Sequence, residues 1–196
     1  MPCEYYLSFD CANRSLAVCL VSIADIKTPC TTSTILYAKV FDLTQGKKLA
    51  TSERTVLLKG CLTDVDVAVN ALIEMHPKVL IEYQMSINDK SRCVSNQVLY
   101  HYSGRFNDCN SVGVHLVGPS LKNKVCFSGD EKYLHSTFMG MYASSYTANK
   151  KHTSANLMYW LKKNDQLYIV KNIKKKNLDD IADAFVQIYG HIMYKK

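Results

Sequence analysis

The chain has 196 residues, of which 47% are hydrophobic and 21% are charged, and its net charge is +7. This length and composition predict one globular domain over residues 1–196, and they exclude a disordered or fibrous chain. No apolar run approaches the roughly 18 residues that a membrane-spanning helix needs, so we expect no membrane partner.

Three strand-like segments come first in the chain. Residues 5–11 are apolar and aromatic, residues 15–23 are rich in Val, Leu and Ile, and residues 34–43 hold a similar mixture. The break at 12–14 is short enough for a hairpin, and the segment 27–33 contains a proline typical of a longer turn. The three strands are therefore predicted to form an antiparallel meander.

Helix-like and strand-like segments alternate in the rest of the chain. We predict a helix over 64–75, a strand over 78–84, a helix over 91–102, a strand over 112–117, a short helix over 130–142, and longer helices over 149–163 and 177–189. Three antiparallel strands followed by βα units predict an α/β fold: a five-stranded mixed sheet with helices on both faces.

The cysteines indicate the cellular compartment, and the distribution of charge indicates the kind of partner. None of the eight cysteines forms a C-x-x-C pair, which is typical of reduced thiols in a cytosol-like compartment rather than of disulfides or a zinc site. Residues 1–100 hold 10 Lys and Arg against 10 Asp and Glu, whereas residues 101–196 hold 14 against 7. This one-sided excess favours a polyanionic partner, with nucleic acid ahead of a membrane, although a merely solvated basic surface would have the same composition.

Acidic residues beside apolar neighbours are the most informative feature. Asp10 lies in the first strand-like run, Glu82 ends another, and Asp180 and Asp183 lie one helical turn apart in the last predicted helix. Buried acids are costly unless they are paired or bind a cation. Brought together, these four would make an oxygen-only site suited to Mg²⁺ or Mn²⁺.

Each acid also has a simpler explanation. Asp10 could cap the turn that follows its strand, and Glu82 could pair with a lysine or arginine. Asn177 could be the N-cap of the last helix with Asp180 at the third position, in an arrangement like a capping box. This leaves Asp183, which lies deeper and beside the apolar face, without an explanation.

Several stretches of the sequence resemble RuvC-type Holliday junction resolvases of the RNase H-like nuclease superfamily, and most of all the branch encoded by poxviruses and related large DNA viruses. The matching stretches are Phe9-Asp10, Val79-Leu80-Ile81-Glu82-Tyr83-Gln84, Val117-Gly118-Pro119-Ser120, Lys150-Lys151 at the head of a helix, and Leu178-Asp179-Asp180-Ile181-Ala182-Asp183-Ala184. The last is the most specific. The resemblance implies an RNase H-like fold.

The resemblance implies a metal-dependent nuclease. It assigns metal binding and catalysis to Asp10, Glu82, Asp180 and Asp183, which would hold two Mg²⁺ ions, with Mn²⁺ able to substitute. Two ions held in this way align a water molecule and the leaving oxygen for attack on a phosphodiester, so no nucleophilic side chain is needed.

The resemblance also implies a catalytic basic residue near the scissile phosphate, ahead of the penultimate helix. Lys151 is the first candidate and Lys150 the second, although a solvated lysine pair at a helix start would look the same. Further phosphate contacts are expected from lysines after a strand end and from the basic run before the last helix. These DNA-binding candidates are Lys122, Lys124, Lys150, Lys151, Lys174, Lys175 and Lys176.

A C₂ homodimer would match the approximate two-fold symmetry of a four-way junction, and the resemblance places its interface on the helix after Glu82. We expect no nucleotide cofactor, because no glycine-rich phosphate loop is present. The expected location is the cytoplasm, at sites of viral DNA replication.

The expected function is resolution of Holliday and other branched DNA junctions by paired, metal-dependent hydrolysis during viral recombination and replication. The alternatives are a ribonuclease H-like nuclease acting on RNA–DNA hybrids and a non-catalytic junction-binding protein.

Overall fold

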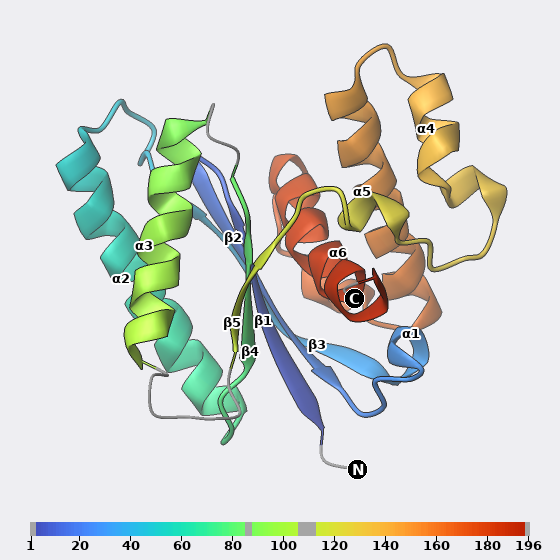
Figure 1. Cartoon of the computed structure of the whole chain (residues 1–196), viewed down its shortest axis with the longest axis horizontal. Helices are drawn as coiled ribbons and strands as arrows, with labels where there is room; N and C mark the ends of the chain where they lie inside the picture. The colour runs from blue at the N-terminus through green and yellow to red at the C-terminus, as the bar shows by residue number, and fades with distance from the viewer. Residues whose placement is uncertain (1–2, 85–87, 106–112, 195–196) are drawn as a thin grey trace.

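The computed structural model describes residues 3–84, 88–105 and 113–194, and Figure 1 shows a central sheet with helices on both faces. The strands are β1 (Glu4–Cys11), β2 (Ser15–Ile23), β3 (Ser33–Asp42), β4 (Lys78–Glu82) and β5 (Val114–Val117). Their order in the sheet is β3-β2-β1-β4-β5. The β1–β2 and β2–β3 pairs are antiparallel, and the β1–β4 and β4–β5 pairs are parallel. The predicted five-stranded mixed sheet is therefore confirmed.

Helices cover the two faces of this sheet. The helices are α1 (Pro29–Thr32), α2 (Thr51–Leu72), α3 (Asp89–Arg105), α4 (His135–Met141), α5 (Ser145–Lys163) and α6 (Leu178–Tyr194). Short 3₁₀ turns are η1 (Lys122–Lys124), η2 (Glu131–Tyr133), η3 (Leu167–Val170) and η4 (Lys175–Asn177). In Figure 1, α2 and α3 lie on one face, and α4, α5 and α6 lie on the other.

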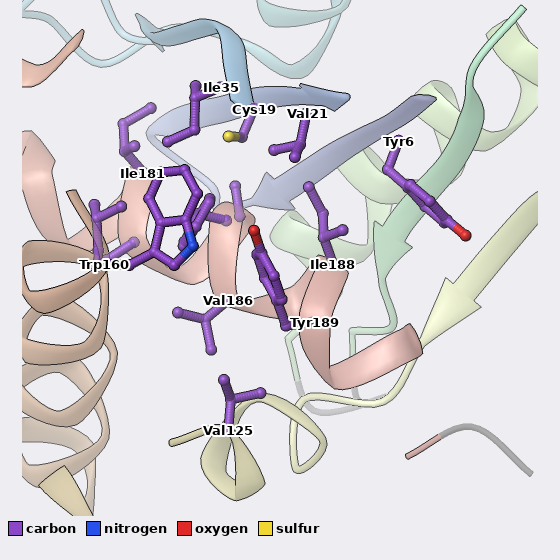
Figure 2. Close-up of a cluster of buried hydrophobic side chains, with 14 of the residues drawn as sticks. Tyr6, Cys19, Val21, Ile35, Val125, Trp160, Ile181, Val186, Ile188 and Tyr189 are labelled. Carbon is purple, nitrogen blue, oxygen red and sulfur yellow. The ribbon is translucent and has the colours of Figure 1, made fainter. Parts of the chain in front are cut away.

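The alternation of side chains along the strands builds two cores. On β1, Leu7 and Phe9 belong to the cluster under α2 and α3, whereas Tyr6 belongs to the cluster under α5 and α6. Figure 2 shows the second cluster, in which Trp160 of α5 and Tyr189 of α6 lie among buried side chains that include Cys19 and Val21 of β2. Both faces of the sheet are thus closed by apolar packing, which makes the strand ends the positions open to polar side chains.

One predicted helix was placed wrongly. The prediction over 64–75 corresponds to α2, which begins 13 residues earlier at Thr51 and ends at Leu72. Its buried residues continue the helical spacing through the missed part: they are Leu58, Cys61, Leu62, Val65 and Val69. Packing of this stripe on the sheet outweighs the low helix propensity of Gly60 and of the threonines and serine in the first half.

The other predictions need smaller changes. The predicted turn over 27–33 contains the single-turn helix α1, and α5 and α6 are longer than predicted. Residue 112, the predicted start of the fifth strand, lies outside the described residues. The seven cysteines in the described ranges are all free thiols. In those same ranges, no helix combines the length and apolarity needed to cross a membrane.

Candidate active site

Two of the predicted acids lie on neighbouring strands and point to the same face of the sheet. β1 and β4 are parallel, and Phe9 is paired with Ile81. Both of these side chains are buried under α2 and α3, so the next residues, Asp10 and Glu82, point to the face covered by α6. The two carboxylates therefore lie at the carboxyl ends of adjacent parallel strands, where open α/β sheets build their active sites.

The other two acids come from α6. Asp180 and Asp183 are one turn apart, and Asp183 is only 5% exposed. Ser15 Oγ donates a hydrogen bond to Asp180 Oδ2 at 3.0 Å, and Thr153 Oγ1 donates to Asp183 Oδ1 at 2.7 Å. The carboxylate of Asp180 is thus engaged by side chains of other elements, which does not support the capping explanation. We call Asp10, Glu82, Asp180 and Asp183 the acid cluster.

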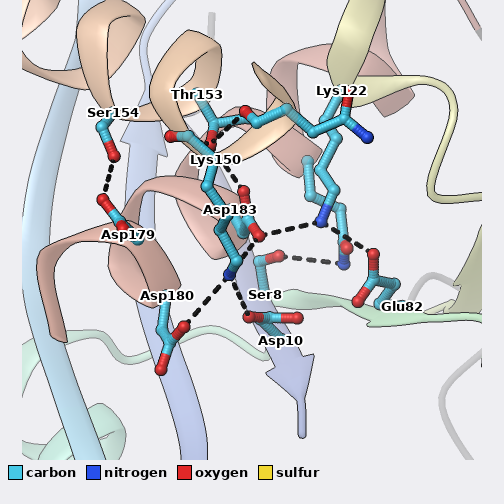
Figure 3. Close-up of polar contacts among 12 residues, drawn as sticks. Ser8, Asp10, Glu82, Lys122, Lys150, Thr153, Ser154, Asp179, Asp180 and Asp183 are labelled. Atoms are coloured by element: carbon cyan, nitrogen blue, oxygen red, sulfur yellow. Dashed lines mark hydrogen bonds and ion pairs between the residues drawn. The ribbon is translucent and has the colours of Figure 1, made fainter. Parts of the chain in front are cut away.

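Lys150, from the first half of α5, lies inside the acid cluster (Figure 3). Its Nζ is 2.7 Å from Asp183 Oδ2, 3.1 Å from Asp180 Oδ1 and 3.9 Å from Asp10 Oδ2. This ammonium group therefore joins the strand that carries Asp10 to the helix that carries the other two acids.

Lys122, in the 3₁₀ turn after β5, is a second cation in the cluster. Its Nζ is 2.8 Å from Glu82 Oε1 and 3.2 Å from Asp183 Oδ2. Glu82 thus has the lysine partner that was considered as an alternative to a metal. Asp183 is shared by both ammonium groups, which makes it the centre of the cluster.

A close approach of backbone to backbone sets the position of Lys122. Gly118 accepts a hydrogen bond from the amide of Leu121 at 3.2 Å and so turns the chain back after β5. This segment then lies directly on Gly190 of α6, where a Cβ atom would be 2.9 Å from the carbonyl carbon of Leu121. Only glycine at 190 allows this contact without a shift of the turn that carries Lys122.

Burial and neighbouring charges both shift the pKa values of the groups in the cluster. Burial raises the pKa of Asp10 well above its usual value, and the charges of Glu82 and Asp183 add to this effect. Burial alone would also raise the pKa of Asp183, but Lys122 and Lys150 hold it below its usual value. Burial would lower the pKa of both lysines, yet the surrounding acids raise it. Asp10 therefore holds a proton more readily than Glu82 or Asp183, whose pKa values are lowered, while both lysines stay charged.

The chemistry of the cluster fits a divalent metal ion. All its donors are carboxylate oxygens, the ligands that Mg²⁺ and Mn²⁺ prefer, and two cationic groups already lie between them. Within the described ranges, no three His, Cys, Asp or Glu side chains already surround a common metal position. A bound ion would therefore have to displace an ammonium group from these oxygens.

The structure separates the predicted lysines into two groups. Lys150 lies among the carboxylates, whereas Lys151, the first candidate for the basic residue near the scissile phosphate, is exposed. Lys122, predicted to contact DNA from the surface, is instead buried and paired with acids. The remaining predicted DNA-binding lysines are exposed: Lys124, Lys174, Lys175 and Lys176.

Sequence reasoning missed the hydroxyl groups that orient the acids. Ser15 opens β2, and Thr153 lies three residues after Lys150 on α5. The spacing of Thr153 from Lys150 was a usable signal, because residues three apart on a helix share one face. No comparable sequence signal pointed to Ser15, because its partner Asp180 is 165 residues away.

No family model and no curated protein matches the chain, but solved structures do. Fowlpox virus resolvase, solved in complex with substrate Holliday junction DNA, is 16% identical, with a TM-score of 0.57 over 98% of this chain and 100% of that one. Thermus thermophilus RuvC is 11% identical, with a TM-score of 0.57 over 96% of this chain and 95% of that one.

The chain has the RuvC-type resolvase fold. A further structure, T. thermophilus RuvC in complex with Holliday junction substrate, gives a TM-score of 0.53 at 11% identity over 96% of this chain and 94% of that one. The likeness thus extends over nearly the whole of each protein. At these identities it establishes the RuvC-type fold, and the chemistry of this chain has to be argued from its own residues.

Proposed function

We propose that the protein is a metal-dependent endonuclease that resolves four-way and other branched DNA junctions by paired hydrolysis of phosphodiester bonds. One observation carries the proposal: four carboxylates from β1, β4 and α6 converge with the ammonium groups of Lys122 and Lys150 at the carboxyl ends of two parallel strands. The RuvC-type fold and the net charge of +7 support a nucleic-acid substrate.

Asp10, Glu82, Asp180 and Asp183 would hold the metal. When bound, Mg²⁺ would lower the pKa of an attacking water molecule and stabilise charge on the departing oxygen. We expect two ions at each site and expect Mn²⁺ to substitute, since both ions prefer carboxylate oxygen.

The side chains of the protein have their own parts in this mechanism. Lys150 pairs with Asp180 and Asp183 in this structure, and at this position its ammonium group would neutralise charge on a phosphate oxygen bound beside the acids. Thr153 and Ser15 keep Asp183 and Asp180 in fixed orientations, so that the cluster is preorganised before substrate binds. Burial at the cluster strengthens each of these electrostatic contacts.

Two sites are needed to cut two opposed strands of a junction, so we propose a C₂ homodimer. The outer face of α3 is the proposed interface. It presents exposed Cys93, Asn96 and Tyr100, and Tyr100 is 76% exposed. The proposed setting is viral DNA recombination and replication in the host cytoplasm.

The proposal is tested by comparing three labelled substrates: a synthetic four-way junction, a linear duplex and an RNA–DNA hybrid. We expect paired, symmetrical nicks in the junction alone, with Mg²⁺ or Mn²⁺ and not with EDTA. Cleavage restricted to the hybrid would instead identify a ribonuclease H-like enzyme. Tight junction binding without cleavage in either metal would leave a binding protein and overturn the proposal.

A further inference from the structure

A large basic groove runs beside the acid cluster. It has a volume of about 1350 Å³ and lies between the β1–β2 turn, the β3–α2 connection and the segment before α6. Eight Lys and Arg side chains line it, against only two acids, Asp42 and Asp180. Asp180 is already paired with Lys150, which lies outside the lining, so Asp42 is left as the acid that offsets the groove cations.

The groove cations are exposed and available to a ligand. Six of them, all exposed, come from four separate segments of the chain. They are Arg14, Lys47, Lys48, Lys90, Lys174 and Lys176. Among the described residues, no ion pair involves any of these six. Unpaired cations gathered in a concave surface focus a positive field and attract a polyanion.

The start of α2 adds to this field and fixes the shape of the groove. Ala50 and Thr51 line the groove at the N-terminus of a 22-residue helix, the positive end of its dipole. Arg54 Nη1 donates to the side chain of Asn13, and its Nη2 donates to the carbonyl of Leu49 at 3.3 Å. These contacts tie the β1–β2 turn to the start of α2, so the two walls are held together without a ligand.

The groove is continuous with the acid cluster. A smaller hollow of about 310 Å³ shares Lys176 and Asp180 with the groove and is also lined by Lys150, Lys151 and Tyr146. Asp180 therefore borders both spaces, and Figure 3 shows it at the edge of the cluster, facing Lys150. A polyanion lying in the groove would therefore reach the edge of the acid cluster at Asp180.

We propose that this groove binds the sugar-phosphate backbone of one duplex arm of the branched DNA as it leaves the cleavage site. The inference rests on the proposed function and adds to it a binding surface that extends beyond the catalytic acids. Duplex DNA carries one charge for about every 1.7 Å of its axis, so cations spread over several segments suit an extended backbone better than a single phosphate. Such contacts position the arm and do not read its sequence.

Charge-neutralising double variants test this role. Lys47→Gln combined with Lys48→Gln removes two neighbouring groove cations, and Lys162→Gln combined with Lys163→Gln removes two neighbouring exposed lysines outside the groove. Both pairs are placed in an Asp183→Asn background, so that a four-way junction is bound in Mg²⁺ without being cut. The dissociation constant is then measured over a range of salt concentrations.

The groove variant should weaken junction binding about tenfold or more and should reduce the slope of log K against log salt by about 1 to 2. The control variant should change neither. Junctions with arms of about 6 and about 20 base pairs give a second readout: longer arms should increase the affinity of the parent protein, and the groove variant should lose this gain. A groove variant that behaves like its control in both readouts overturns the inference.

Failure of this inference can be told from failure of the proposed function. If the wild-type protein nicks junctions but the groove variant binds like the control, the inference fails and the nuclease remains. If the wild-type protein cuts no junction in Mg²⁺ while the groove variant still loses affinity and salt dependence, the proposed nuclease function is refuted. The inference that the groove binds the DNA backbone is then still supported.

Discussion

At the scale of single residues, the site depends on which of two adjacent lysines faces the acids. Neighbouring residues on a helix point in directions about 100° apart, so Lys150 and Lys151 cannot both enter the cluster. Sequence alone could predict a lysine here but not which one, because that choice depends on how α5 is rotated against α6. The structure places Lys150 inside the cluster and Lys151 on the surface.

Substituting each lysine should separate catalysis from binding. Lys150→Gln should lower the single-turnover rate of junction cleavage about 100-fold, since it removes a buried charge beside the proposed scissile phosphate. Lys151→Gln, the matched control on the next residue, should weaken junction binding slightly and leave the rate at saturating protein within about threefold. Equal rates for the two variants would show that the position of Lys150 has no part in catalysis.

The ammonium group of Lys122 should neutralise the same carboxylates that a metal ion would bind. Lys122→Met leaves Glu82 and Asp183 without one of their cations, and loss of one partner from a buried pair destabilises by about 3–5 kcal/mol. We expect lower stability to urea in EDTA and substantial recovery with Mg²⁺. Lys124→Met, an exposed control in the same turn, should show neither effect. If Mg²⁺ gave Lys122→Met no more stability than it gave wild type, the metal and the ammonium group would not share these oxygens.

At the scale of elements, the sequence predicted the strands better than the helices. The strands alternate or are apolar throughout, and their bounds follow from that pattern. The first half of α2 was missed because its local propensity is low, although its buried spacing is helical. The acids could be predicted from their apolar surroundings. The pairing of β1 with β4 that brings Asp10 beside Glu82 is a long-range contact that local sequence does not encode.

The contact between α4 and α5 should make stability depend on pH. His152 is fully buried, and its ring lies 5.4 Å from that of His135 and 5.6 Å from that of Phe138. Burial, and then the charge of His135, lower the pKa of His152 from 6.5 to about 4. Between these values the unfolded chain binds a proton that the folded protein does not. The stabilising contribution is therefore complete above pH 6.5 and is lost as the pH falls toward 4.

His152→Phe should remove this dependence while keeping an aromatic ring in the packing. The measurement is urea unfolding of wild type and variant at pH 7 and pH 4.5. The free energy of unfolding should fall less for the variant than for wild type over this interval. An equal fall in both proteins would mean that His152 is not the group responsible.

At the scale of the whole molecule, two identical sites require two chains. Tyr100→Glu places a charge at the centre of the outer face of α3 and should raise the dimer dissociation constant at least about 30-fold. Tyr168→Glu, at a tyrosine that is 63% exposed and far from α3 in sequence, is the control and should remain dimeric. Analytical ultracentrifugation separates these outcomes. A monomeric wild-type protein that still makes paired nicks would contradict the proposed assembly.

The central claim is that the acid cluster is the catalytic centre, and single substitutions of its members test it most directly. The measurement is the rate of nicking of a four-way junction in Mg²⁺ by Asp10→Asn, Glu82→Gln, Asp180→Asn and Asp183→Asn, with Asp179→Asn as control. Asp179 is the adjacent acid, and it accepts a hydrogen bond from Ser154 instead of joining the cluster. We expect each cluster variant to lose at least about 100-fold in rate while still binding the junction, and Asp179→Asn to stay near wild type. Full activity in any cluster variant, or an equal loss in Asp179→Asn, would contradict the account.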